Sequence, residues 1–181
     1  FRTASPFIDA PANEEFSISV APSTSASSSE ALVTYNYTLA EGGSYVLIAD
    51  GTISPTGYSP AKAFSIEVYP MGREVASYAT NTDLLIHHGS TDAPTVDVVE
   101  TGVGAGTIVD NASYGDFTAY LELPTNDYTL DITDETGQVT VASYSAPLQT
   151  LGLNGAAAVV VASGFLNPSN NSNGPAFGLY V

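Results

Sequence analysis

The sequence predicts an all-β protein with two tandem antiparallel β-sandwich domains, and three observations support this prediction. Only 12% of the 181 residues are charged, whereas Ser, Thr, Ala, Val and Gly are abundant, a composition that suits strands and turns rather than exposed helices. Apolar or alternating runs of strand length recur along the chain, separated by Gly, Pro, Asn and Asp. The pattern of the first half also recurs in the second half.

Residues 1–69 are predicted to form the first domain. Its strands are expected at 16–20, 31–39, 44–49 and 63–69. A Ser-rich loop separates the first pair, and Asp50-Gly51 ends the continuous apolar run of the third. Residues 70–81 contain Pro, Gly and both signs of charge without a clear period, so we expect a linker there.

Residues 82–181 are predicted to form the second domain. Its opening stretch, 82–100, has two apolar runs joined by a polar turn over 89–94, which indicates strand, turn and strand. The Gly-rich segment 102–106 resembles a phosphate-binding loop in composition only. Strand-forming residues follow it instead of a helix, so we expect a hairpin connection.

A single offset relates the two halves. Gly51 precedes Gly164 by 113 residues, and the same offset pairs Pro11 with Pro124 and Phe64 with Phe177. It also superimposes runs of matching strand periodicity, including Phe7-Ile8-Asp9 on Tyr120-Leu121-Glu122 and Val46–Ala49 on Val159–Ala162. The pattern predicts a duplicated fold.

The offset also predicts an incomplete first domain. It pairs Phe1 with Tyr114, so residues 82–113 have no counterpart in the first half. A sandwich that lacks its first strands exposes sheet edges and an apolar face, which native proteins cover. Two explanations remain open: the chain is part of a longer protein with further residues upstream, or strands from another chain complete the first domain by β-addition.

The charge balance excludes some classes of partner. The chain has 3 basic and 19 acidic residues, for a net charge of -16, and nucleic acid binding needs basic residues to replace the counterions of the phosphates. Membrane insertion is not expected, since the most apolar segment, 156–162, is only of strand length. Without cysteine there is neither a disulfide nor a thiolate site.

The opening stretch of the second half resembles the domain-of-unknown-function family 4397. The resemblance lies in Leu85-Ile86-His87-His88-Gly89-Ser90-Thr91-Asp92-Ala93-Pro94 and Val96-Asp97-Val98-Val99. Thr91 stands where the family usually has proline, and Val99 where it has tyrosine. The resemblance implies Ig-like or transthyretin-like sandwiches in tandem copies, on secreted or cell-surface proteins of bacteria and archaea, with no established activity.

The polar residues of this stretch are expected to be structural. Adjacent strand residues point to opposite faces, so His87 and His88 cannot both bind one metal ion. We expect His88 to hydrogen-bond the following turn. Ser90, His88 and Asp92 are triad residue types, but they are too close in sequence to adopt triad geometry, so no catalytic residue is predicted and the protein is not expected to be an enzyme.

The turn itself gives three further expectations. The Asp92 carboxylate is expected to accept backbone N–H groups of its own turn as an Asx-type cap, while Pro94 fixes φ. Asp97 lies between two valines of an alternating strand, so we expect it on the opposite, solvated face.

Two kinds of ligand are considered. Asp131, Asp134 and Glu135 beside Gly137 are weak candidates for calcium, because three carboxylates near a turn can supply oxygen ligands. An exposed row of Tyr35, Tyr37 and Tyr45 would suit a glycan, although core packing is the default for such residues. No other cofactor is expected.

These observations favour a non-enzymatic structural or adhesive module of an extracellular or cell-surface protein of a prokaryote. If another chain completes the first domain, the module is a fibre or filament subunit, and its partner is a second copy or another surface protein chain. A ligand-binding module for glycan or calcium is the alternative.

Overall fold

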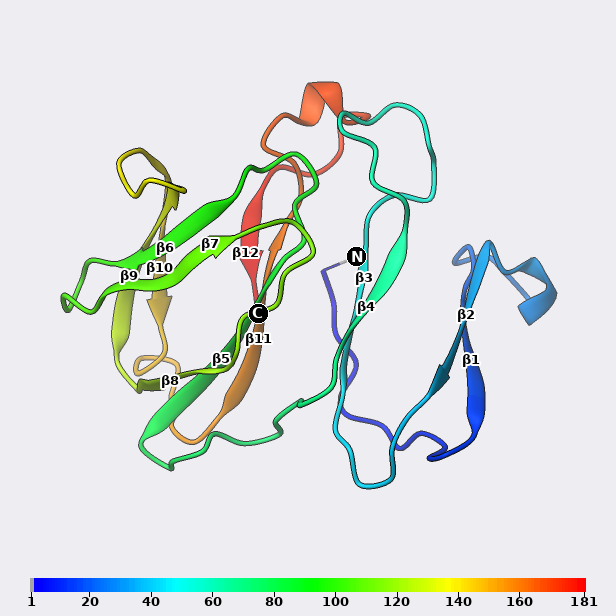
Figure 1. The fold of residues 1–181 in the computed structure, drawn as a ribbon, viewed down its shortest axis with the longest axis horizontal. Coiled ribbons are helices and arrows are strands. Elements are labelled where there is room, and N and C mark those ends of the chain that lie inside the picture. The colour runs from blue at the N-terminus through cyan, green and yellow to red at the C-terminus, as the bar shows by residue number, and fades with distance from the viewer. Residues whose placement is uncertain (1) are drawn as a thin grey trace.

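The computed structural model describes residues 2–181 as an all-β protein whose strands form two sandwich-like groups (Figure 1). This confirms the predicted fold class. Helical structure is limited, among these residues, to the short 3-10 turns Ser28–Glu30 and Pro168–Asn170. No helix in this part of the chain has the length and apolarity needed to cross a membrane. Phe1, which the offset pairs with Tyr114, lies outside the described residues.

The second group, here called the C-terminal sandwich, consists of two four-stranded sheets. The first sheet has the order β10-β9-β6-β7, with β10(Thr140–Pro147), β9(Asp127–Asp134), β6(Val96–Glu100) and β7(Gly106–Ala112). The second has the order β12-β11-β5-β8, with β12(Gly178–Tyr180), β11(Ala157–Ser163), β5(Asn81–His88) and β8(Leu121–Pro124).

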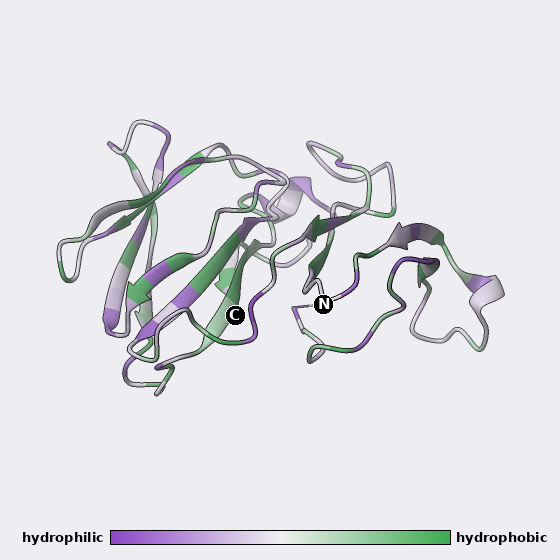
Figure 2. Cartoon of the chain, turned by 60° about the horizontal axis from the view of Figure 1, so that its bottom comes forward, coloured by the Kyte–Doolittle hydropathy of each residue, from purple (hydrophilic) through white to green (hydrophobic). Residues whose placement is uncertain are grey.

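The core of the molecule lies between these two sheets. Alternate residues of each strand point inward, as the period of two requires, so that green hydrophobic segments alternate with paler or purple ones along the strands (Figure 2). The buried cluster comprises Leu84, Ile86, Val96, Val98, Val109, Tyr128, Leu130, Ile132, Leu148 and Val160. All of its members come from the C-terminal sandwich.

One strand pair differs from the predicted antiparallel arrangement. β5 and β11 run parallel, with partners from Asp83↔Ala157 to His88↔Ala162, while β8 pairs with β5 in the antiparallel sense. A parallel pair needs a long connection. Here the connection consists of β6, β7, β9 and β10, which form the opposite sheet, and of β8, which is the edge strand next to β5.

The first group consists of two antiparallel hairpins. They are β1(Glu15–Val20) with β2(Val33–Thr38), and β3(Val46–Asp50) with β4(Ser65–Tyr69). The hairpins face each other: the Tyr35 hydroxyl donates to the Phe64 carbonyl at 2.7 Å, and the Tyr37 hydroxyl donates to the Ile66 carbonyl at 3.4 Å. These tyrosines therefore pack inward, and they do not form the exposed row considered for a glycan.

The hairpin β3–β4 reproduces the geometry of β11–β12. The register pairs Asp50↔Ser65 and Ser163↔Gly178 are related by the offset of 113 residues, as are the parallel bridges Thr52↔Ala63 and Phe165↔Ala176. The offset does not extend to the other hairpin, because β2 follows a longer loop after β1 than β10 follows after β9. The correspondence thus covers one hairpin, and a duplication of the whole domain stays a prediction.

The segment between β4 and β5 lies against the C-terminal sandwich. Val75 forms an isolated bridge with Ala156, and the amide of Ala76 donates to the Gly155 carbonyl at 2.8 Å. The predicted linker is therefore attached to the second group along part of its length, and the domain boundaries at 69 and 82 stay a prediction.

Candidate functional site

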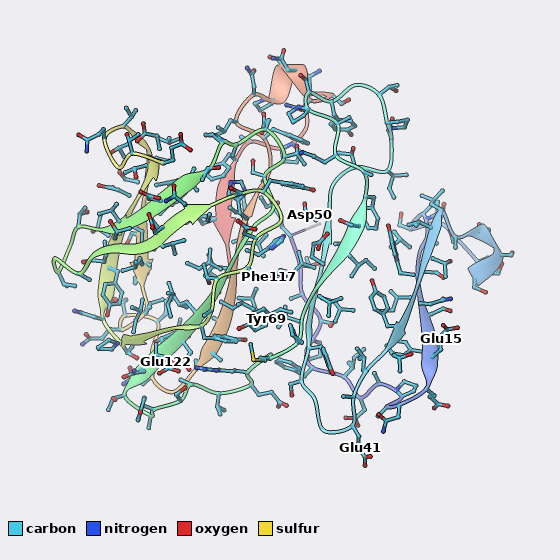
Figure 3. All side chains as sticks on the ribbon, in the orientation of Figure 1. Glu15, Glu41, Asp50, Tyr69, Phe117 and Glu122 are labelled. Carbon is cyan, nitrogen blue, oxygen red and sulfur yellow. The ribbon has the colours of Figure 1, made fainter. Side chains whose placement is uncertain are left out.

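The most unusual feature of the molecule is the outer face of β5, which is buried although it points away from the sandwich core. Leu84 and Ile86 belong to the core cluster, whereas Asp83, Leu85 and His87 alternate with them and are each 0% exposed. The hairpin β3–β4 lies on this side of β5, and Asp50, Tyr69 and Phe117 meet between the two groups (Figure 3). We call this region the junction.

Asp50 and His87 form the polar centre of the junction. Nε2 of His87 lies 3.1 Å from Oδ2 of Asp50, and both side chains are buried. An ionised carboxylate only accepts, so Nε2 carries the proton in this bond. The Asp50 carboxylate also accepts from the Gly51 amide at 2.7 Å and from the Tyr114 hydroxyl. Burial, followed by the charge of Asp50 and this hydrogen bond, raises the pKa of Tyr114 well above its usual value.

Aromatic rings surround this pair. The ring of Phe117 lies 4.4 Å from that of His87 and 5.5 Å from that of Tyr69, and Tyr69 also contacts Tyr120 edge-on at 5.8 Å. Such ring pairs add about 0.5 to 1.5 kcal/mol each beyond the area that they bury. The junction is therefore a small second core with a hydrogen-bonded histidine and aspartate at its centre.

Arg73 fastens the segment before β5 to the same sheet. Its Nη1 donates to Oδ2 of Asp83 at 2.5 Å and to Oε1 of Glu122 at 2.8 Å, and its guanidinium lies 4.7 Å from the centre of the Tyr120 ring. The hydrogen bonds to Glu122 and Asp83 raise the pKa of Arg73, and the bond from Arg73 lowers the pKa of Glu122. The buried charge of Asp83 is thus paired, as burial requires.

Asp92 joins distant loops instead of capping its own turn. Its carboxylate accepts from the amides of Leu166 at 2.9 Å and Asn167 at 2.8 Å, and from Nδ2 of Asn171 at 2.9 Å. The expected Asx-type cap is therefore wrong in its partners. The loop after β11 folds back over the turn that contains Asp92, and the backbone amides of this loop bond the carboxylate in place of those of the turn. Asn171 in turn accepts from the Ser59 amide at 2.9 Å, which extends the connection to the first group.

The two remaining triad residue types bond backbone carbonyls. Nε2 of His88 lies 3.1 Å from the carbonyl oxygen of Pro94, which is the hydrogen bond to the following turn that the sequence predicts. The Ser90 hydroxyl, which is fully buried, donates to the carbonyl of Gly164 at 2.7 Å. His88 and Ser90 thus hold the turn between β5 and β6 in place, against its own proline and against the end of β11.

Asp97 is buried, with 6% exposure, so the expectation of a solvated face is wrong. Oδ1 of Asp97 accepts from the amide of Asn111 at 2.7 Å. The register between β6 and β7 shifts on both sides of Val98, and Asn111 has a φ of 56°. This irregularity turns the Asn111 amide towards the outer face of β6, where the Asp97 carboxylate accepts its hydrogen bond.

The calcium candidates do not gather around one point. Asp134 caps its own turn, since its Oδ1 accepts from the Thr136 hydroxyl at 2.9 Å and the Gln138 amide at 3.0 Å, and the bond from Thr136 is the main reason that its pKa is lowered. Asp131 accepts from the Ser143 hydroxyl at 2.5 Å. None of these three bonds involves Glu135. Within residues 2–181, no group of three or more His, Cys, Asp or Glu residues is arranged to hold a metal ion.

The Gly-rich loop 102–106 does form a cradle of backbone amides, which sequence reasoning missed. The cradle holds the carboxylate of Glu100, which accepts from the amides of Gly102 at 2.7 Å, Val103 at 3.0 Å and Ala105 at 3.0 Å. Burial works to raise the pKa of Glu100, but these amides together hold it below its usual value. An acidic residue directly before a Gly-rich hairpin is the sequence signal that could have revealed this arrangement.

Comparison with known families bears on the C-terminal sandwich. The sequence model of the family described as "Domain of unknown function (DUF4397)" matches residues 82–170. This part of the chain belongs to that family. The DUF4397 domain runs from β5 to the 3-10 turn after β11, so the match does not reach the first group, and tandem copies stay a prediction. No curated protein and no solved structure matches the chain significantly.

Proposed function

We propose that this protein is a structural or adhesive module of an extracellular or cell-surface protein of a prokaryote, in which the junction joins two β-sandwich groups into one stiff unit. The observation that carries the proposal is the burial of Asp83, Leu85 and His87 beneath β3, β4 and the segment around Arg73. Interfaces between independent domains are usually more polar and permit relative motion. A buried, aromatic and hydrogen-bonded junction instead favours one fixed orientation.

The chemistry of the polar residues supports a structural role. Each buried polar side chain described above makes at least one hydrogen bond to another side chain or to the backbone, as His87 does with Asp50 and Ser90 with Gly164, although Nδ1 of His87 and Oδ1 of Asp83 have no partner within the described part of the chain. A net charge of -16 favours solubility and suits a surface in contact with the medium. Two of the tyrosines considered for a glycan, Tyr35 and Tyr37, donate to the carbonyls of Phe64 and Ile66.

The experiment that tests this proposal is labelling of intact cells. Antibodies raised against residues 1–181 would be applied to cells that produce the protein, before and after permeabilisation, and viewed by electron microscopy. We expect label on the surface of intact cells, in a continuous layer or along appendages. An antibody against a cytoplasmic protein of the same cells is the control. Label that appears only after permeabilisation would contradict the proposal.

A further inference from the structure

One edge of β3 is unpaired, whereas the corresponding edge of β11 is paired with a strand. In the C-terminal sandwich, β11 pairs with β12 on one side and with β5 on the other. β3 pairs with β4 in the register that relates β11 to β12. Among the described residues, no strand pairs with the other edge of β3.

The local backbone of the two hairpins agrees in detail. Gly51 and Gly164 have φ values of 74° and 93°, and a Cβ on either would lie 2.3 Å from the carbonyl oxygen of an alanine, Ala63 or Ala176. The following bond is also shared, since the Thr52 amide donates to Lys62 and the Phe165 amide donates to Pro175, both at 2.9 Å. The open edge of β3 is therefore built like the edge of β11 that receives β5.

Apolar residues around this edge are exposed where their counterparts are covered. Val160 and Ala162 of β11 are buried, whereas Ala49, the counterpart of Ala162, is exposed and Leu47 is only half-buried. Phe7 and Ile8 are 51% and 76% exposed. The counterpart of Ile8 by the offset is Leu121, which pairs with Leu84 of β5. The exposed apolar side chains at this edge are therefore suited to contact a strand that resembles β5.

The first group buries little apolar surface. No apolar residue of this group belongs to the buried core. Two facing two-stranded ribbons bury too little apolar surface for independent stability, whereas a strand added beside β3 would pair its open edge and cover Leu47 and Ala49.

We propose that the open edge of β3 accepts an added strand of the β5 type. The strand runs parallel to β3, as β5 runs parallel to β11. The offset of 113 residues transfers the register of β5 on β11 to β3. In this register the inward residues of the added strand lie opposite Tyr45, Leu47 and Ala49. The occupant is an extended segment that is not among residues 1–181, with aliphatic residues at alternate positions as at Leu84 and Ile86. Main-chain hydrogen bonds supply affinity, and the alternate side chains supply specificity.

This inference rests on the proposed structural role, because strand addition is a way of joining modules. The two proposals fail separately. Labelling of whole cells tests the location, whereas the added strand is tested on the purified chain with a synthetic peptide.

The probe is a peptide with the sequence of residues 81–89, NTDLLIHHG, added to the full chain of 181 residues. We expect saturable binding by calorimetry, together with slower amide hydrogen exchange over residues 46–50 and unchanged exchange in β11. A peptide with serine in place of Leu84 and Ile86 is the matched control, because it keeps the length and charge but loses the inward aliphatic residues. It should bind about tenfold more weakly or worse, since each buried aliphatic side chain contributes about 1.5 to 3 kcal/mol.

A variant of the chain tests the site itself. Ala49→Glu puts a charge on an exposed position, so the chain should fold, but that charge would lie in the completed core and should weaken peptide binding about tenfold or more. Ala79→Glu, also at an exposed position, is the control and should bind like the original chain. Absence of binding, equal binding to Ala49→Glu, or a dimer of the chain alone that takes up the edge would each overturn the proposal.

Discussion

Asp50 is the residue on which the junction depends most, because three donors from three segments converge on its carboxylate. The Gly51 amide, Nε2 of His87 and the Tyr114 hydroxyl all bond it. His87 and Tyr114 belong to the DUF4397 domain, while Asp50 ends β3. The residue thus joins the two groups through charge-assisted hydrogen bonds in a region that excludes water.

Asp50→Ala is expected to lower the free energy of unfolding by about 3 to 5 kcal/mol, because it leaves the buried donors of Gly51, His87 and Tyr114 without their acceptor. Urea unfolding followed by tyrosine fluorescence measures the change. Asp50→Asn, which keeps one acceptor oxygen, should lose less.

The control is Asp9→Ala, which removes an exposed carboxylate and should leave the stability nearly unchanged. A similar small loss for Asp50→Ala would show that the pair with His87 does not hold the junction together.

Glu100 contributes to the pH dependence of the free energy of unfolding. Its pKa is lowered in the folded state, so its contribution to stability is complete above the ordinary glutamate pKa of 4.5 and is lost as the pH falls through the lowered value. In Glu100→Gln this loss should be absent, and the curve of unfolding free energy against pH should be flatter below pH 4.5. Urea titrations at several pH values measure it, and an unchanged acid limb would contradict the assignment.

At the scale of elements, the turn after β3 and the turn after β11 use one device. Gly51 and Gly164 adopt positive φ, and each lies so close to an alanine carbonyl that a side chain has no room. Glycine is needed at both positions for two reasons, the conformation and the close approach.

Gly164→Ala is expected to lose about 2 kcal/mol more than Gly104→Ala, since both glycines have positive φ but only Gly164 has atoms within reach of a Cβ. Gly51→Ala should behave like Gly164→Ala if the two hairpins are equivalent. Thermal unfolding of the three variants compares them directly, and an equal loss at Gly104 and Gly164 would show that the close approach has no effect.

β5 shows how far the sequence could predict an element. The alternation around Leu84 and Ile86 located the strand, and the adjacent histidines were placed on opposite faces, as the partners Pro94 and Asp50 show. The burial of its outer face could not be predicted, because its cover comes from β3, β4 and the segment around Arg73, and no local pattern encodes contacts of such long range.

Asp92 and Asp97 mark the same limit at the level of hydrogen bonds. Their residue types indicated carboxylates that accept backbone amides or face water, but their partners are the amides of Leu166, Asn167 and Asn111. Those partners depend on how a loop returns and where a bulge falls, which only the assembled sheets determine.

At the scale of the whole molecule, the first group has no buried apolar core of its own and lies against a complete sandwich. The two groups are connected at several points along their length, from Arg73 at the outer face of β5 and β8 to Ser59 at the loop that contains Asn171. The DUF4397 domain therefore serves as the support on which the hairpins are held.

The parallel pairing of β5 with β11 also determines the order of events during synthesis. β5 leaves the ribosome first among the strands of the DUF4397 domain, and its partner β11 follows only after five further strands. Long-range pairing of this kind folds slowly, because loop closure must precede the contacts. Residues 46–69 are synthesised before β5, so β3 is the first strand of the β11 kind that β5 can meet, and β11 becomes available only later.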